Sequence, residues 1–209
     1  MKIQPVVEGY GEVDAVPVML RRLRDEGQAY GIEVGRPIRR KRHELVQEAS
    51  LRKAVRLALL QKDCRAVLIL FDGDDDCPAE VAPIIQAWAQ SEAGVVPVAV
   101  VIAQREYEAW FLASMESLRG KRGILNDATS HPAPEESRDA KGQVEDRMAP
   151  QCSYLETADQ AALTAMFDLA PTYARCRSFR KMVKAFGNLA IDMGVELADW
   201  PPPVWAAEE

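Results

Sequence analysis

Residues 66–76 have the sequence AVLILFDGDDD, in which six apolar residues precede four acidic residues and one glycine. An unbroken apolar run of this length is typical of a strand buried on both faces, as in a parallel sheet covered by helices. Open α/β sheets bind ligands just beyond the carboxyl ends of such strands. Because side chains alternate along a strand, Asp72 and Asp74 are expected to point toward one ion, with Asp76 extending the set. Carboxylates suit hard divalent cations, so the stretch predicts a Mg²⁺ or Mn²⁺ site, with a solvated acidic turn as the alternative.

The composition is that of a chain with a full hydrophobic core. Hydrophobic residues make up 48% of the 209 residues, which suits one domain, or one domain with a helical appendage. The formal net charge of −6 argues against broad, nonspecific binding to nucleic acid or acidic membranes. The four cysteines form no CxxC pair, so a structural zinc site is not expected. Without a signal-like N-terminus or an apolar run that could span a bilayer, we expect a cytoplasmic protein with no membrane contact.

Apolar strands and amphipathic helices alternate along the first half of the chain. This order indicates an α/β fold with right-handed crossovers and a mainly parallel, four-stranded sheet flanked by helices. The strands are expected at residues 3–7, 32–38, 66–71 and 95–102, and the connecting helices after residue 12, at 44–61 and at 78–92. We assign residues 1–118 to this α/β core, 119–151 to an exposed irregular connection, and 152–209 to a C-terminal helical extension that packs on the core.

Acidic residues follow three of the four predicted strands. Because the carboxyl ends of parallel strands meet at one edge of the sheet, these side chains are expected to converge there. Acidic residues at three strand ends are harder to explain by chance than acidic residues at one. This favours a metal site. The candidate metal ligands are Glu8, Glu12, Asp72, Asp74, Asp76 and Glu108.

Basic residues gather at two places. Residues 36–43 form the only dense basic cluster, and Arg39, Arg40, Lys41 and Arg42 are candidate phosphate contacts. The amphipathic helix predicted over 178–186 places basic residues opposite its packing face, where one of them is available to pair with a carboxylate or steady a phosphate. Lys181 is therefore a candidate catalytic residue, and Arg180 and Lys184 are candidate nucleic-acid contacts. For both groups a solvated surface is the alternative.

Two motifs resemble those of a known superfamily. Residues 7–12, VEGYGE, resemble the VEGxxE turn of Toprim domains, and residues 70–76, LFDGDDD, resemble their DxD motif. The segments around Glu8 and Glu12, 72–74, 108–110 and 178–181, taken in order, resemble the DUF4276 family more narrowly. The resemblance covers residues 3–186, although residues 119–151 have no counterpart that we can place.

The resemblance implies a Toprim/Rossmann-like sheet and Mg²⁺-dependent (or Mn²⁺-dependent) phosphoryl chemistry on nucleic acid, DNA or RNA. Glu8 would be the general base or a metal ligand, Asp72 and Asp74 would hold the metal, and Glu12 would fill a second metal site, as in overcoming-lysogenization-defect nucleases. A topoisomerase would need a nucleophilic tyrosine on a further domain, for which we expect no room here, and the cysteine spacing does not supply the zinc module of a primase, so hydrolysis is the expected reaction. The resemblance also implies a bacterial defence-type effector with an ATPase partner, and a homodimer is a further expectation.

Three other interpretations compete with a nuclease. A nucleotide-sugar transferase also uses a DxD motif, but would not explain Glu8 and Glu12 at another strand end. A phosphatase of the haloacid dehalogenase type carries its DxD motif on the first strand rather than the third. A non-catalytic Toprim-like scaffold or sensor subunit of an ATPase complex is the stronger alternative, although a scaffold gains nothing from clustered carboxylates.

Overall fold

The computed structural model describes residues 1–205 and contains a parallel sheet with β1 (Lys2–Val7) at its centre. On one side β1 pairs with β4 (Cys64–Asp72), which in turn pairs with the edge strand β5 (Val98–Ala103). On the other side β1 pairs with two short strands, β2 (Glu33–Val34) and β3 (Ile38–Arg39). The expected α/β fold with a parallel sheet is confirmed, with five strands in place of four. The predicted strand over 32–38 is divided into β2 and β3. Pro37 lies between them and has no backbone N–H to donate to β1.

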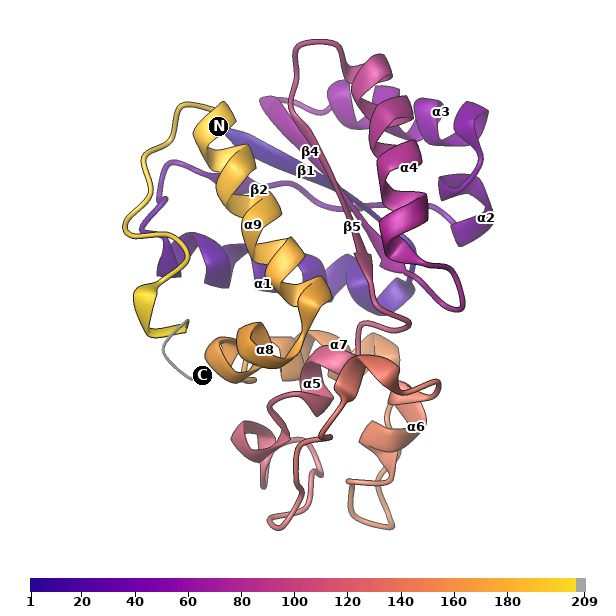
Figure 1. Ribbon diagram of the computed structural model, residues 1–209, viewed down its shortest axis with the longest axis vertical. Coiled ribbons are helices and arrows are strands. Elements are labelled where there is room, and N and C mark those ends of the chain that lie inside the picture. The colour runs from indigo at the N-terminus through magenta and orange to yellow at the C-terminus, as the bar shows by residue number, and fades with distance from the viewer. Residues whose placement is uncertain (206–209) are drawn as a thin grey trace.

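Helices cover both faces of the sheet (Figure 1). The β4 side chains alternate between two hydrophobic clusters, which explains the unbroken apolar run: Leu68 and Leu70 face one, Ile69 and Phe71 the other. The first cluster packs against α1 and α9, and the second against α3 and α4. The helices are α1 (Tyr10–Glu26), α2 (Arg42–Leu45), α3 (Glu48–Leu59), α4 (Pro78–Ala93), α5 (Ala109–Leu112), α6 (Ala140–Glu145), α7 (Glu156–Thr164), α8 (Leu169–Arg175) and α9 (Arg177–Asp192), with 3₁₀ turns η1 (Met115–Leu118), η2 (Pro134–Glu136) and η3 (Pro203–Trp205).

Residues 119–151 differ from the exposed connection that the sequence predicts. They contain η2 and α6, and Ile124, Ala140, Val144 and Met148 are buried in the main hydrophobic cluster. Ala140 and Val144 lie four residues apart, so they share one face of α6 and bury it together. Figure 1 shows this segment, with α5, α7 and α8, beyond the carboxyl ends of the strands. The segment therefore helps to enclose the edge of the sheet where ligands are expected.

The C-terminal helices pack on the α/β core. Helix α7 lies along α1, and α9 lies against β5. Gly11 permits the close approach of α7, since a Cβ atom there would lie 2.7 Å from the backbone oxygen of Glu156. Trp205 is buried, whereas residues 206–209 of the predicted extension lie outside the described residues. No helix in the described chain is long and apolar enough to cross a membrane.

Candidate active site

A cavity of about 260 Å³ lies where β1 and β4 end. Four acidic residues line it, from the turn after β1, from α1, from β4 and from α7: Glu8, Glu12, Asp72 and Glu156. Four basic residues line it as well: Arg39, Lys41, Arg42 and Lys141. The cavity therefore combines carboxylates that can bind a cation or accept a proton with cations that can bind an anion.

Glu8 and Asp72 bring carboxylates from neighbouring strands into the cavity. The Oε2 atom of Glu8 is buried and has no hydrogen-bond partner within residues 1–205. Burial, and then the charge of Asp74, raise the pKa of Glu8, although Arg42 opposes the shift. The backbone N–H of Tyr107 donates a 2.8 Å hydrogen bond to Asp72 Oδ1, which fixes this side chain. Burial, followed by the charges of Glu12 and Glu108, raises the pKa of Asp72 well above its usual value.

Glu12 stabilises the start of helix α1. Its Oε2 atom accepts hydrogen bonds from the backbone N–H groups of Glu8, at 2.8 Å, and Gly9, at 3.0 Å. These amides precede the first turn of the helix, where backbone donors lack intrahelical partners. The structure thus gives Glu12 a capping role, while the sequence predicts a second metal ligand. Burial raises the pKa of Glu12 to about 8.

Glu108 is buried and does not line the cavity. The side chain is fully buried, and its Oε1 atom accepts hydrogen bonds from Tyr154 Oη at 2.8 Å and Gln160 Nε2 at 3.2 Å. Burial raises the pKa of Glu108 to about 7. Glu108 follows β5 as expected, but it acts on the cavity through its charge rather than as a group that touches a bound molecule.

Lys141 lines the cavity, and its charge interacts with those of Asp72 and Glu108. The sequence analysis did not identify this residue. Its Nζ atom forms a 3.2 Å ion pair with Glu156, and its backbone N–H donates to Glu106 Oε2 at 3.0 Å. Burial alone would lower the pKa of Lys141, but the charges of Glu108 and Asp72 outweigh burial and raise it. No local pattern marks this lysine, because its carboxylate partners come from distant parts of the chain.

The buried carboxylates predict an unusual dependence of stability on pH. Glu12 and Glu108 retain protons in the folded state at pH values where unfolded glutamates have lost them. The stability that these two protonated carboxyl groups contribute is fully present below their unfolded pKa of 4.5. It is lost as the pH rises toward about 8. In EDTA, the free energy of unfolding should fall across this window, by at most about 1.4 kcal/mol per pH unit for each group. Urea unfolding at several pH values measures this. In Glu108→Gln, the free energy of unfolding should depend less steeply on pH. A free energy of unfolding that rises with pH across this window would contradict the raised pKa values of Glu12 and Glu108.

Asp74 and Asp76 are exposed and paired with Arg42. The Nε atom of Arg42 lies 2.8 Å from Asp74 Oδ2, and its Nη2 atom lies 2.5 Å from Asp76 Oδ2. The sequence-based expectation assumed a strand that continues through both residues, but β4 ends at Asp72. A turn follows, with Asp74 at a φ of 49° and the Asp76 N–H donating to the Gly73 carbonyl. Neither predicted metal ligand lines the cavity, although Asp74 is near enough to act on Glu8.

The family model for a domain of unknown function (DUF4276) matches residues 7–186. The chain belongs to the DUF4276 family. No curated protein and no solved structure gives a significant match. Glu8, Asp72 and Lys141 all fall within the DUF4276 match, so the cavity is built from the family domain itself.

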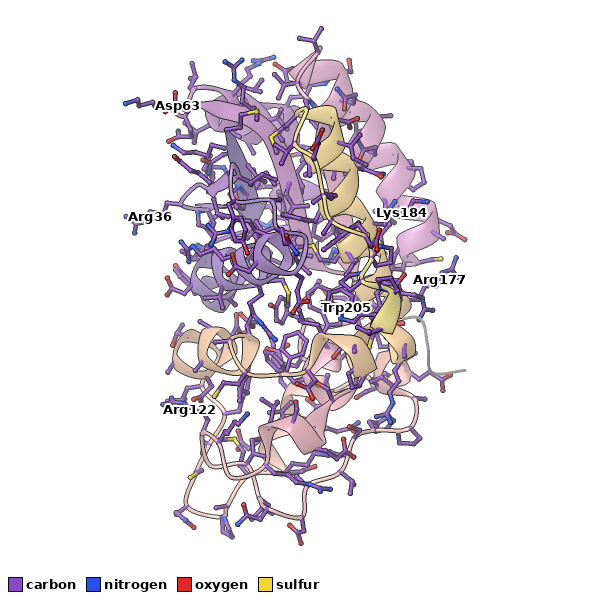
Figure 2. The ribbon with its side chains drawn as sticks, turned by 90° about the vertical axis from the view of Figure 1, so that its left-hand side faces the viewer. Arg36, Asp63, Arg122, Arg177, Lys184 and Trp205 are labelled. Carbon is purple, nitrogen blue, oxygen red and sulfur yellow. The ribbon has the colours of Figure 1, made fainter. Side chains whose placement is uncertain are left out.

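The predicted basic residues of this DUF4276 protein lie at several places, and only some of them line the acidic cavity. Arg39, Lys41 and Arg42 line the acidic cavity, whereas Arg40 Nη1 donates to the Arg39 carbonyl. On α9, Arg180 Nη1 donates to the carbonyls of Tyr173 and Ala174 at the end of α8. Lys181 lines a different cavity, between α4, β5 and α9, and Lys184 lies on another part of α9 (Figure 2). The structure thus brings three of the seven predicted basic residues, Arg39, Lys41 and Arg42, to the acidic cavity.

The residues of the cavity offer few ligands to a divalent ion. Within residues 1–205, no three acidic, histidine or cysteine side chains are grouped as a ready metal centre. Mg²⁺ does not need one, because proteins usually bind it through one or two carboxylates, with water and substrate phosphates as the other ligands. Asp72 and Glu8, with its unpartnered buried oxygen, fit that mode of binding.

Proposed function

We propose that this cavity is the active site of a Toprim-like, metal-dependent phosphodiesterase that hydrolyses nucleic acid. The observation that carries the proposal is the meeting of Glu8 and Asp72 with Arg42, Lys41 and Lys141 in one cavity at the carboxyl edge of the sheet. Phosphodiesters are anions, and their hydrolysis requires charge neutralisation and activation of water. A cavity lined by both charge types supports that chemistry better than a purely acidic or purely basic one.

Asp72 is the carboxylate proposed to hold Mg²⁺ or Mn²⁺. Its Oδ1 atom is fixed by the Tyr107 amide, and its charge is disfavoured by burial and by neighbouring carboxylates, so a cation nearby would be stabilising. When bound, the ion would neutralise negative charge that develops on the phosphate oxygens.

Glu8 is proposed to accept the proton of the attacking water. A general base works best when its pKa lies near the working pH, and burial raises the pKa of Glu8 in that direction. Its Oε2 atom has no partner among the described residues, so no donor there competes with the attacking water for this oxygen.

Arg42 is proposed to bind the phosphate. Two of its guanidinium nitrogens contact Asp74 and Asp76, whereas its Nη1 atom is buried and lacks a partner within residues 1–205. A guanidinium can donate several hydrogen bonds at once, so Nη1 can bind a phosphate oxygen while the other nitrogens keep their carboxylate contacts. Lys41 lines the same cavity and adds positive charge.

The proposal is tested with the full chain, using bis(4-nitrophenyl) phosphate, DNA and RNA as separate substrates. We expect hydrolysis that EDTA abolishes and Mn²⁺ or Mg²⁺ restores, because Asp72 is proposed to hold the ion that neutralises the phosphate. Hydrolysis that survives EDTA would contradict the metal. Absence of hydrolysis on all three substrates would favour the scaffold or sensor interpretation.

The wider context rests on the family resemblance for the ATPase partner and the defence role, and on the sequence for the location. An ATPase partner, a role in phage defence, a homodimer and a cytoplasmic location stay predictions that the same chain can be used to test.

A further inference from the structure

Tyr10 is an exposed aromatic residue at the mouth of the acidic cavity. It opens helix α1, two residues after Glu8, and 66% of its surface is exposed. The Arg39 guanidinium carbon lies 3.8 Å from the centre of the ring, and Arg39 Nη2 donates to Tyr10 Oη at 3.1 Å. Arg39 covers one face of the ring and holds it in place, so the high exposure leaves the opposite face open to solvent.

Arg39 is itself anchored to the turn that follows β1. Its Nη1 atom donates to the Glu8 carbonyl at 3.3 Å. The ring is therefore fixed relative to Glu8, and Tyr10, Arg39 and Arg42 line the same cavity. A flat apolar surface and a phosphate-binding cation thus occur side by side, which is the combination that a nucleotide with a base and a phosphate requires.

We propose that the substrate is single-stranded nucleic acid and that an unpaired base stacks on Tyr10 while the adjoining phosphate binds at Arg42. In a duplex each base has both faces covered by its neighbours, so a base reaches Tyr10 only after it has left the stack, at a cost of about a few kcal/mol. Stacking also tolerates any base, because every base has a π face. This inference rests on the proposed function and specifies its substrate class.

The size of the cavity agrees with a base that lies outside it. Its volume of about 260 Å³ is small for a ligand site and suits a phosphate with its sugar rather than a base as well. The base would then lie outside the cavity, against the exposed ring of Tyr10.

The test measures binding, so it does not depend on catalysis. Short single-stranded DNA and RNA carrying 2-aminopurine are titrated with the full chain, once in EDTA and once in Ca²⁺. We expect quenching of 2-aminopurine on binding, retained in Tyr10→Phe and lost in Tyr10→Leu. Loss of one stacked base should weaken binding by roughly 5- to 150-fold. A duplex with the same sequence should bind more weakly than the single strand.

Tyr30→Leu is the matched control. Tyr30 is 69% exposed but follows α1 in the turn before β2, at the opposite edge of the sheet, so its replacement should leave binding unchanged. Equal binding by Tyr10→Leu and the unmodified chain, equal binding of duplex and single strand, or no binding in either buffer would overturn the inference. Tyr10-dependent binding without hydrolysis would contradict the phosphodiesterase alone, and hydrolysis with Tyr10-independent binding would contradict the stacking alone.

Discussion

Replacing Glu8 with glutamine should lower hydrolysis by about 100- to 10,000-fold, the range for loss of a general base. Glutamine has the same shape but cannot take a proton from water at neutral pH. Because burial and Asp74 disfavour the ionised Glu8, Glu8→Gln should leave the free energy of unfolding unchanged or raise it. Hydrolysis rates and urea unfolding on the same preparation measure both effects.

Glu33→Gln is the control for this change. Glu33 is an exposed glutamate on β2, paired with Lys2 at the opposite edge of the sheet, and its replacement should alter neither quantity. Undiminished hydrolysis in Glu8→Gln would show that Glu8 is not the base. A large loss of stability would show instead that the carboxylate is structural.

Replacing Lys141 with methionine should destabilise the metal-free protein by about 1–3 kcal/mol. Removing one partner of a buried ion pair typically costs about 3–5 kcal/mol. The Lys141 side chain is 39% exposed, so solvent screens part of its interaction and a smaller loss is expected. Methionine keeps much of the chain length while it removes the charge that offsets Asp72 and Glu108. Urea unfolding in EDTA at neutral pH measures the loss.

The loss in Lys141→Met should shrink at lower pH. Glu108, whose pKa burial raises to about 7, then carries less charge for the lysine to offset. Lys53→Met, on the exposed side of α3, should have little effect at any pH. If the two lysine variants lose equal stability, Lys141 does not balance the acidic cluster.

Strand β4 could be predicted because its sequence carries the constraint locally. Residues such as Ile69 and Leu70 are apolar on both faces of the strand, and the structure buries them in two separate clusters. The sequence likewise brought Glu8 to the cavity, since it directly follows β1 and parallel strands end at one edge of the sheet, whereas Glu108 comes five residues after β5 and is buried outside the cavity lining.

The role of the acidic turn could not be predicted from spacing alone. Alternation along a strand holds only while the strand continues, and β4 ends at Asp72. Beyond it, Arg42 reaches from the start of α2 to Asp74 and Asp76. That contact joins residues more than thirty positions apart, so a local sequence pattern cannot predict it.

Lys141 illustrates the same limit in the segment 119–151. Its many glycines, prolines and charges favour a loop, but a few apolar residues such as Val144 are enough to pack it against the core. Burial of that side chain positions α6, and α6 carries Lys141 to the cavity. A lysine in a charged segment has no local feature that distinguishes it from a solvated one.

The central claim, a divalent ion held by Asp72, is tested most directly by calorimetric titration with Mn²⁺. The full chain, Asp72→Asn and Asp63→Asn are titrated with a single-stranded phosphorothioate oligonucleotide present, so that phosphate ligands are available to the ion. Asparagine can still accept the Tyr107 hydrogen bond, and Asp63 lies before β4 at the far end of the sheet (Figure 2). We predict that Mn²⁺ binds to the unmodified chain and to Asp63→Asn. It should not bind to Asp72→Asn. Equal binding to Asp72→Asn, or none to the unmodified chain, would contradict a metal site at this cavity.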